Sequence, residues 1–145
     1  EELIQTGYIK QKYRNKKQKM LPPEKYQAED GTIILVGKNN LQNEQVSFKL
    51  SRRGDLWFHV KDIPGSHVLI TGNANPSDET ITFAGELAAY FSKARYSNLV
   101  QVDVLDVKKL HKPTGTAPGF VTYDREKTIR VTPDESVIKS RKIGK

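Results

Sequence analysis

The stretch "DLWFHVKDIPGSHVLI", residues 55–70, decides the fold because it holds two strand patterns joined by a turn. Its first half alternates between two faces, with Leu56, Phe58 and Val60 on one and Trp57, His59 and Lys61 on the other. A period of two is typical of a β-strand, so the polar and aromatic side chains share one face. The segment "DIPG" then favours a turn, and "SHVLIT" predicts a second strand.

Further strands are predicted on both sides of this stretch. "TIILVG" and "VSFKLS" are short strand patterns separated by "KNNLQNEQ", whose asparagines favour a turn. In the second run Val46, Phe48 and Leu50 alternate with polar residues, which predicts one buried face. "LVQVDVLDVKKL" predicts a long strand, and "GFVTY" with "TIRVT" predicts a hairpin across "DREK".

One long helix is predicted at about residues 77–96. Ser77 is its expected N-cap, acidic residues occupy the first turn, and Lys93 and Arg95 are expected in the last turn, where they complement the helix dipole. Its apolar stripe consists of Ile81, Ala84, Leu87, Ala88 and Phe91. The expected fold class is therefore α+β, with a mixed, largely antiparallel sheet packed with this helix and preceded by an N-terminal helical and basic segment.

Three regions are predicted along the chain. Residues 1–21 would be the end of a helical arm and a basic linker, stopped by Pro22 and Pro23, which cannot sit inside a helix. Residues 22–138 would form the compact domain, and residues 139–145 a basic tail. There is no cysteine and no apolar run of about 20 residues, so we expect neither disulfides nor insertion into a membrane.

The net charge of +7 is concentrated at the two ends of the chain. Residues 1–20 hold six basic residues against two acidic ones, and residues 139–145 hold four basic residues and no acid. Residues 21–138 are close to neutral, with 14 basic and 15 acidic residues. Basic segments attract phosphates whatever the nucleotide sequence, although lysine-rich ends are also common as simply solvated tails.

Two kinds of reactive site were weighed from the same residues. Ser66 and His67 are a nucleophile and a base, but sequence neighbours on a strand point to opposite faces. His59, Asp62, His67 and His111 are ordinary metal-ligand types, yet their spacing matches no established zinc pattern. We therefore expect a binding domain rather than an enzyme, with no catalytic residues, no cofactor and no metal.

Binding is the remaining interpretation of the polar face of the central strand. Trp57, His59 and Lys61 could form a stacking surface with a cation beside it, as single-stranded RNA recognition requires. Alternatively, Trp57 belongs to the core and His59 is satisfied inside it. Periodicity alone leaves these two alternatives equal.

Four blocks in order resemble a known family: "VGKNNLQNE", "LWFHVKDIPGSHVLI", "LAAYFSKAR" and "VKKLHKPTGTAPGFVTYDREKTIRVTP". Across about residues 20–136 the chain resembles the NFACT-R domain, the C-terminal RNA-binding module of the NFACT proteins. The family pattern Asp-x-Trp-x-His fits residues 55–59, followed by Asp62, Gly65 and His67.

The resemblance implies a recognition module of a ribosome-associated quality control factor in the cytoplasm. Its expected partners are tRNA and the 50S subunit carrying a stalled peptidyl-tRNA, with alanine tailing as the process it supports. Lys16, Lys17 and Lys19 would contact phosphates, and a more selective surface would consist of Lys38, Asn39, Asn40, Arg53, Trp57, His59, Lys61 and His67. The family also includes fibronectin-binding proteins of the Gram-positive cell surface, so an adhesive module that adds a strand to a sheet edge is the alternative.

Overall fold

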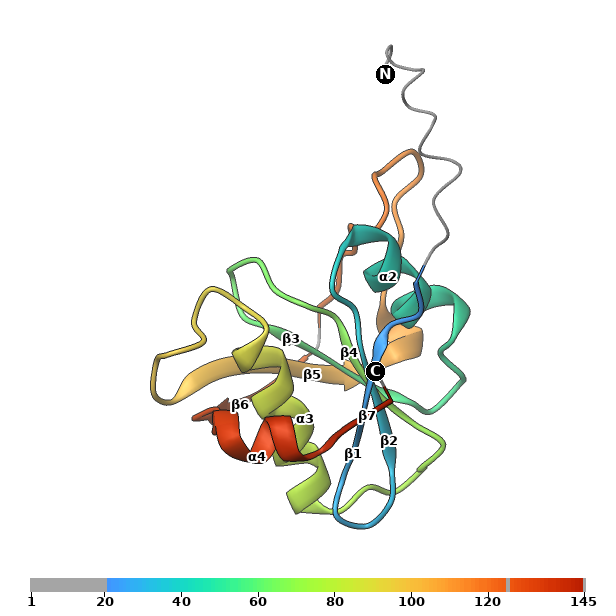
Figure 1. Cartoon of the computed structure of the whole chain (residues 1–145). Coiled ribbons are helices and arrows are strands. Elements are labelled where there is room, and N and C mark those ends of the chain that lie inside the picture. The colour runs from blue at the N-terminus through green and yellow to red at the C-terminus, as the bar shows by residue number, and fades with distance from the viewer. Residues whose placement is uncertain (1–20, 125, 145) are drawn as a thin grey trace.

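A seven-stranded antiparallel sheet organises the residues described by this computed structural model, which are 21–124 and 126–144. The predicted N-terminal helical segment lies outside these ranges. The strand order is β6-β5-β3-β4-β2-β1-β7 (Figure 1). The bounds are β1 Glu24–Gln27, β2 Ile33–Val36, β3 Leu56–Val60, β4 Val68–Thr71, β5 Val100–Asp106, β6 Lys127–Val131 and β7 Lys142–Ile143. The predicted α+β class and largely antiparallel sheet are confirmed.

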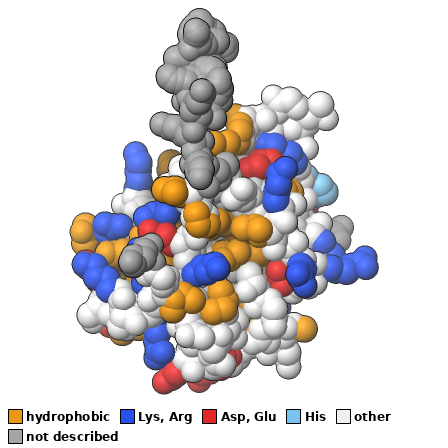
Figure 2. Space-filling view, turned by 45° about the vertical axis from the view of Figure 1, so that its right-hand side comes forward, with side chains coloured by type: hydrophobic (Ala, Val, Ile, Leu, Met, Phe, Trp, Pro, Cys, Tyr) orange, Lys and Arg blue, Asp and Glu red, His pale blue; other side chains and the backbone are white. Residues whose placement is uncertain are grey.

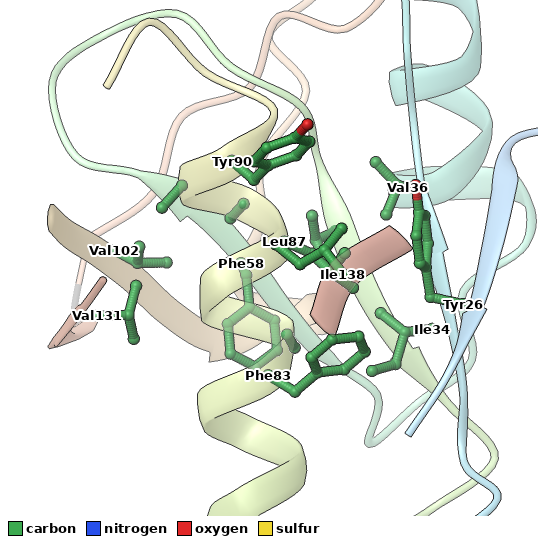
Figure 3. Packing of buried hydrophobic residues seen from close by; sticks show 14 of the residues in the cluster. Tyr26, Ile34, Val36, Phe58, Phe83, Leu87, Tyr90, Val102, Val131 and Ile138 are labelled. Carbon is green, nitrogen blue, oxygen red and sulfur yellow. The ribbon is translucent and has the colours of Figure 1, made fainter. Parts of the chain in front are cut away.

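One face of the sheet is covered by helix α3, Asp78–Tyr90, and the short helix α4, Glu135–Ser140, packs beside it (Figure 1). Helix α3 begins at its predicted cap, since the hydroxyl oxygen of Ser77 accepts a hydrogen bond from the backbone N–H of Thr80 at 3.1 Å. Phe83 and Leu87 of α3 pack in one buried cluster with Phe58 of β3 (Figure 3). This cluster is the main hydrophobic core.

The opposite face of the sheet carries a second, smaller core. It is covered by the π-helical segment η2, Gln45–Lys49, which directly follows helix α2, Asn40–Glu44, and by the 3-10 turn η3, Val107–Lys109. Its fully or largely buried members are Leu35, Val46, Trp57, Leu69, Leu105, Val107 and Leu110. Strand β3 is central and has a core on each face, so its side chains are buried or partly buried on both faces, and Trp57 is a core residue with no exposed surface.

The predicted strand "VSFKLS" is wrong, because residues 45–49 wind into η2 directly after α2. Asn39 caps α2 by accepting the backbone N–H of Gln42 at 2.9 Å, which starts a helical path. Val46 is buried but Leu50 is exposed, so the alternation of apolar residues does not reflect a two-sided strand.

Two other boundaries differ from expectation. Helix α3 ends at Tyr90, because Phe91 leaves the helical conformation with φ −93° and ψ 49°, so Lys93 and Arg95 do not lie in its last turn. The predicted hairpin of "GFVTY" with "TIRVT" is also wrong. Strand β6 pairs with β5, while Thr122 makes an isolated bridge with His111.

The C-terminal residues take part in the fold. Helix α4 includes Lys139, and β7 adds two residues to the sheet edge beside β1. Neither α4 nor β7 was predicted, nor was β1. The three region limits drawn from the sequence stay a prediction. In the part of the chain that the structure describes, no helix is long and apolar enough to span a membrane.

Candidate nucleic-acid interface

The turn between β3 and β4, residues 61–67, separates two hollows on the surface. Gly65 brings this turn against the segment after α3, where the backbone N–H of Ser66 donates to the carbonyl of Phe91 at 3.0 Å. A Cβ at Gly65 would lie 2.9 Å from the Val60 side chain and 3.0 Å from that of Ser92. Only glycine allows this close approach, so the "DIPGSH" motif positions the two hollows relative to each other.

The first hollow, which we call the basic groove, has a volume of about 380 Å³. Three separate segments supply its polar side chains: the loop before α2, the β3–β4 turn, and the chain after α3. Its lining residues include Lys38, Asn39, Asn40, Ser66, Lys93 and Arg95. Of the predicted site residues, Lys38, Asn39 and Asn40 are therefore brought together here.

Two cations of the basic groove, Lys38 and Arg95, lie over aromatic rings. The Lys38 Nζ lies 4.3 Å from the ring centroid of Phe91, and the Arg95 Cζ lies 4.1 Å from that of Tyr90. Arg95 also donates through Nε to the carbonyl of Tyr90 at 2.9 Å. Lys38 has a long contact of 3.7 Å with Glu24, whereas Arg95 has no ion pair within residues 21–124 and 126–144. Cations that aromatic rings hold in place suit phosphate binding.

Sequence reasoning missed Lys93 and Arg95 as groove residues because it extended α3 by one and a half turns. The signal that could have found them is the pair Phe91-Ser92, where the helical stripe stops. Asn39, by contrast, was predicted to contact RNA, but its side chain is occupied as the N-cap of α2.

The second hollow, which we call the aromatic–histidine pocket, has a volume of about 400 Å³. It lies on the other side of the same turn and shares Pro64 with the basic groove. Its lining residues are Trp57, His59, Asp62, Ile63, Pro64, His67, Gly119, Phe120, Val121 and Tyr123. The predicted residues Trp57, His59 and His67 therefore converge here.

The rings of this pocket are closely packed. Trp57 and His59 are stacked, with centroids 5.7 Å apart and an interplanar angle of 8°. The ring of His67 meets Trp57 edge-on at 5.0 Å and His59 at 5.5 Å, and Tyr123 meets Trp57 edge-on at 5.2 Å. Because Trp57 is fully buried, the accessible member of the stack is the partly buried His59.

A chain of hydrogen bonds holds the ring of His67 in place. The indole Nε1–H of Trp57 donates to Ser47 Oγ at 2.9 Å, and Ser47 Oγ lies 2.7 Å from Nδ1 of His67. An indole nitrogen can only donate, so the Ser47 hydroxyl proton is free to be donated to Nδ1. Burial, helped by the neighbouring His59, lowers the pKa of His67 to about 3, which keeps the ring neutral.

One wall of the pocket is a loop held in place by α2. The carboxylate of Glu44 accepts the backbone N–H of Gly119 at 2.7 Å and pairs with Lys112 Nζ at 3.2 Å. Lys112 in turn donates to the carbonyls of Ala117 and Phe120. These contacts position Phe120, whose side chain is 44% exposed, at the pocket.

Two further predicted residues lie elsewhere. Lys61 is paired with the buried Asp103 at 2.9 Å and with Glu126 at 3.2 Å, so its charge is already countered. Arg53 is exposed in the turn before β3 and lines neither hollow. Lys16, Lys17 and Lys19 fall outside the described residues.

The residues weighed as metal ligands are not arranged as a metal site, although His59, Asp62 and His67 line the same pocket. Within the described ranges, no group of three or more histidine, aspartate or glutamate side chains is arranged to hold a metal ion. His111 is exposed and lies at the bridge to Thr122, not in the aromatic–histidine pocket.

The surface carries its charges in separate groups. Figure 2 shows a face on which lysine and arginine side chains lie around exposed hydrophobic ones, with a few acidic side chains between them. On this face there is no single uniform basic patch. Local hollows that collect cations are therefore more informative about a polyanion site than the total charge.

A cationic groove beside an aromatic pocket is the combination used by domains that bind single-stranded RNA. The sequence profile of the NFACT protein RNA binding domain matches residues 24–122. The chain belongs to this family.

Similar proteins carry a ribosome quality control name. The Rqc2 homolog RqcH of Streptococcus suis is 67% identical over 99% of this chain, and that of Bacillus subtilis is 48% identical over 98%. The chain spans 26% of the length of each. The ribosome quality control complex subunit 2 of Schizosaccharomyces pombe is 36% identical over 61% of this chain, which corresponds to 9% of that protein.

A solved structure has the same fold. It is the C-terminal part of the fibronectin/fibrinogen-binding protein of Streptococcus suis, with a TM-score of 0.89 and 66% identity. The match covers 97% of this chain and 58% of that one. The relatives therefore carry two kinds of name, one for ribosome quality control and one for binding to fibronectin or fibrinogen.

Proposed function

We propose that this domain binds tRNA or large-subunit ribosomal RNA, with the basic groove holding the phosphates. The observation that carries the proposal is the convergence of Lys38, Lys93 and Arg95 from two distant segments beside the turn of the family motif. Phosphate contacts supply salt-dependent affinity, and nearby amides such as Asn40 supply additional hydrogen bonds.

The proposed setting is a cytoplasmic quality control factor. In it, this domain helps a longer protein recognise a 50S subunit that carries a stalled peptidyl-tRNA, and so supports alanine tailing. The quality control names of the relatives support this setting. The domain contributes recognition rather than catalysis in this proposal, because both hollows are built from binding groups.

Removing the groove cations tests the proposal. The variant Lys38→Ala, Lys93→Ala, Arg95→Ala is compared with Lys49→Ala, Lys108→Ala, Lys109→Ala, which loses the same charge from exposed positions that do not line the groove. Binding to labelled total tRNA and to isolated 50S subunits is measured across a salt series, with folding checked by circular dichroism.

The groove variant is expected to lower the slope of log affinity against log salt by about 2 to 3, since each lost phosphate contact removes about 1. The control variant is expected to keep most of the slope. Equal losses in the two variants would show that only the overall charge matters and would overturn the groove as the binding site.

A second candidate is binding to a matrix protein at the cell surface, favoured by the name of the similar Streptococcus suis structure. An added strand would pair with an open sheet edge such as β6. Binding to immobilised fibronectin that resists salt and ignores the groove substitutions supports this candidate. Binding that disappears with salt, or with the groove cations, counts against it.

A further inference from the structure

We propose that the aromatic–histidine pocket takes one unpaired nucleobase of the RNA, with the phosphates of the same strand in the basic groove. This inference rests on the proposed RNA binding and adds what the second hollow recognises. The two hollows adjoin through Pro64, so a strand passing over the β3–β4 turn would reach both.

The two hollows differ in charge and therefore suit different parts of an RNA strand. The basic groove is lined by Lys38, Lys93 and Arg95, whereas no lysine or arginine is among the residues that line the aromatic–histidine pocket. Aromatic and apolar side chains dominate the pocket instead, namely Trp57, His59, Ile63, Pro64, Phe120, Val121 and Tyr123. Such walls suit a flat neutral ring and not a phosphate.

Stacking is available at the accessible end of the pocket. His59 already stacks on Trp57 with nearly parallel rings, and Trp57 is fixed by its hydrogen bond to Ser47. The exposed ring of Phe120 lies at the same pocket. A base inserted there contacts aromatic surfaces that are held rigid before it arrives, which reduces the ordering cost of binding.

A directional hydrogen bond comes from His67. In the tautomer in which the Ser47 hydroxyl donates to Nδ1, the proton sits on Nε2, and the residue is only 4% exposed. An N–H that the ring presents to the pocket is best matched by an acceptor, such as a base carbonyl or ring nitrogen.

The rim adds the complementary group. Asp62 lines the pocket with an exposed carboxylate, and it is held in a left-handed conformation with φ 64° that turns the chain at this point. A carboxylate accepts hydrogen bonds from an exocyclic amino group. Adenine and cytosine each carry a ring-nitrogen acceptor next to an exocyclic amino group. The pocket should therefore favour these bases over uracil.

Intrinsic fluorescence provides a direct readout, because Trp57 is the only tryptophan in the chain and lines the pocket. A short single-stranded RNA is titrated into the protein alongside a strand of equal length in which every base is replaced by an abasic site. The intact strand should bind about 5- to 150-fold more tightly and change the Trp57 emission, whereas the abasic strand should not change it.

Two variants address the pocket without touching the groove. His67→Asn keeps an acceptor for the Ser47 hydroxyl but removes the Nε2–H, and Phe120→Ala removes the exposed ring. Leu50→Ala is the matched control, because Leu50 and Phe120 are both 44% exposed. Both pocket variants should lose affinity for the intact strand at unchanged salt slope, and Leu50→Ala should not.

The outcomes distinguish this inference from the proposed function. If the groove variant weakens both strands while the pocket variants and the missing bases have no effect, RNA binding stands and the base pocket is wrong. If neither strand binds, both proposals fail. If His67→Asn does not fold, the abasic comparison and Phe120→Ala decide the question alone.

Discussion

The Oγ of Ser47 lies 2.7 Å from the Nδ1 of His67, although the two residues are 20 positions apart. This pair, rather than the sequence neighbours Ser66 and His67, brings a hydroxyl to the histidine. Ser47 is buried and also accepts the indole N–H of Trp57. The pair therefore ties η2 to the central strands and orients His67.

Replacing Trp57 should damage the fold before it affects RNA binding. We expect Trp57→Ala to lower the free energy of unfolding by about 3–5 kcal/mol, because it leaves a large cavity. Trp57→Phe should cost less, about 1–2 kcal/mol, since mainly the hydrogen bond to Ser47 is lost. Urea denaturation followed by circular dichroism measures both. A Trp57→Ala variant with parental stability but no RNA binding would contradict the core assignment.

Stability should fall as the solution becomes mildly acidic. The pKa of His67 is about 3 in the folded chain and 6.5 when unfolded, so between these values the unfolded state binds more protons. Unfolding is thus favoured as pH falls from 6.5 towards 3, and His59, whose pKa is also lowered by burial, acts in the same direction.

Urea denaturation should show a loss of about 2 kcal/mol from His67 between about pH 7 and pH 5. His67→Asn should be less stable at neutral pH but should show a smaller loss on acidification. A parental chain whose stability is flat over this range would mean that His67 is not buried in its neutral form.

We expect Lys61 to stabilise the fold rather than to contact phosphate. Its two carboxylate partners raise the pKa of Lys61 and counter its positive charge. In Lys61→Met, the buried Asp103 would lose its cationic partner. We expect this variant to unfold at lower urea concentration while the salt slope of RNA binding stays the same. Lys38→Ala should instead lower that slope by about 1 at little cost in stability. If Lys61→Met lowered the salt slope of RNA binding, Lys61 would contact phosphate after all.

The loop wall of the pocket should depend on Glu44. In Glu44→Ala, the backbone N–H of Gly119 loses a charged acceptor, so its hydrogen exchange should become about 10- to 100-fold faster. Glu29→Ala, at a largely exposed carboxylate away from this loop, serves as the control. Unchanged exchange at Gly119 would show that the loop is held by other contacts.

The motif strand could be predicted from sequence, but the environment of its polar face could not. Period-two alternation places Trp57 and His59 on the same side of β3, as observed. Whether that side is covered depends on α2, η2 and the 107–123 segment, which come from distant parts of the chain. The local pattern contains no information on that second layer, so surface and core remained equal alternatives.

The groove residues illustrate the same limit. Lys93 and Arg95 fit the pattern of a helix C-terminus, but the helix ends earlier, directly before the tertiary bridge between Ser92 and Gly65. β7 was missed because two residues among many lysines carry no strand pattern, and it forms only by pairing with β1. Interactions between distant segments decided each of these features.

The pairing of β1 with β7 has a mechanical consequence. Lys25 faces Ile143 and Tyr26 faces Lys142, so the two ends of the described chain leave the sheet side by side (Figure 1). Tension applied between these ends would load the few hydrogen bonds of β7 one after another, as in opening a zipper, instead of shearing them together. The outermost strand would detach at low force, while the sheet that carries both hollows would stay folded.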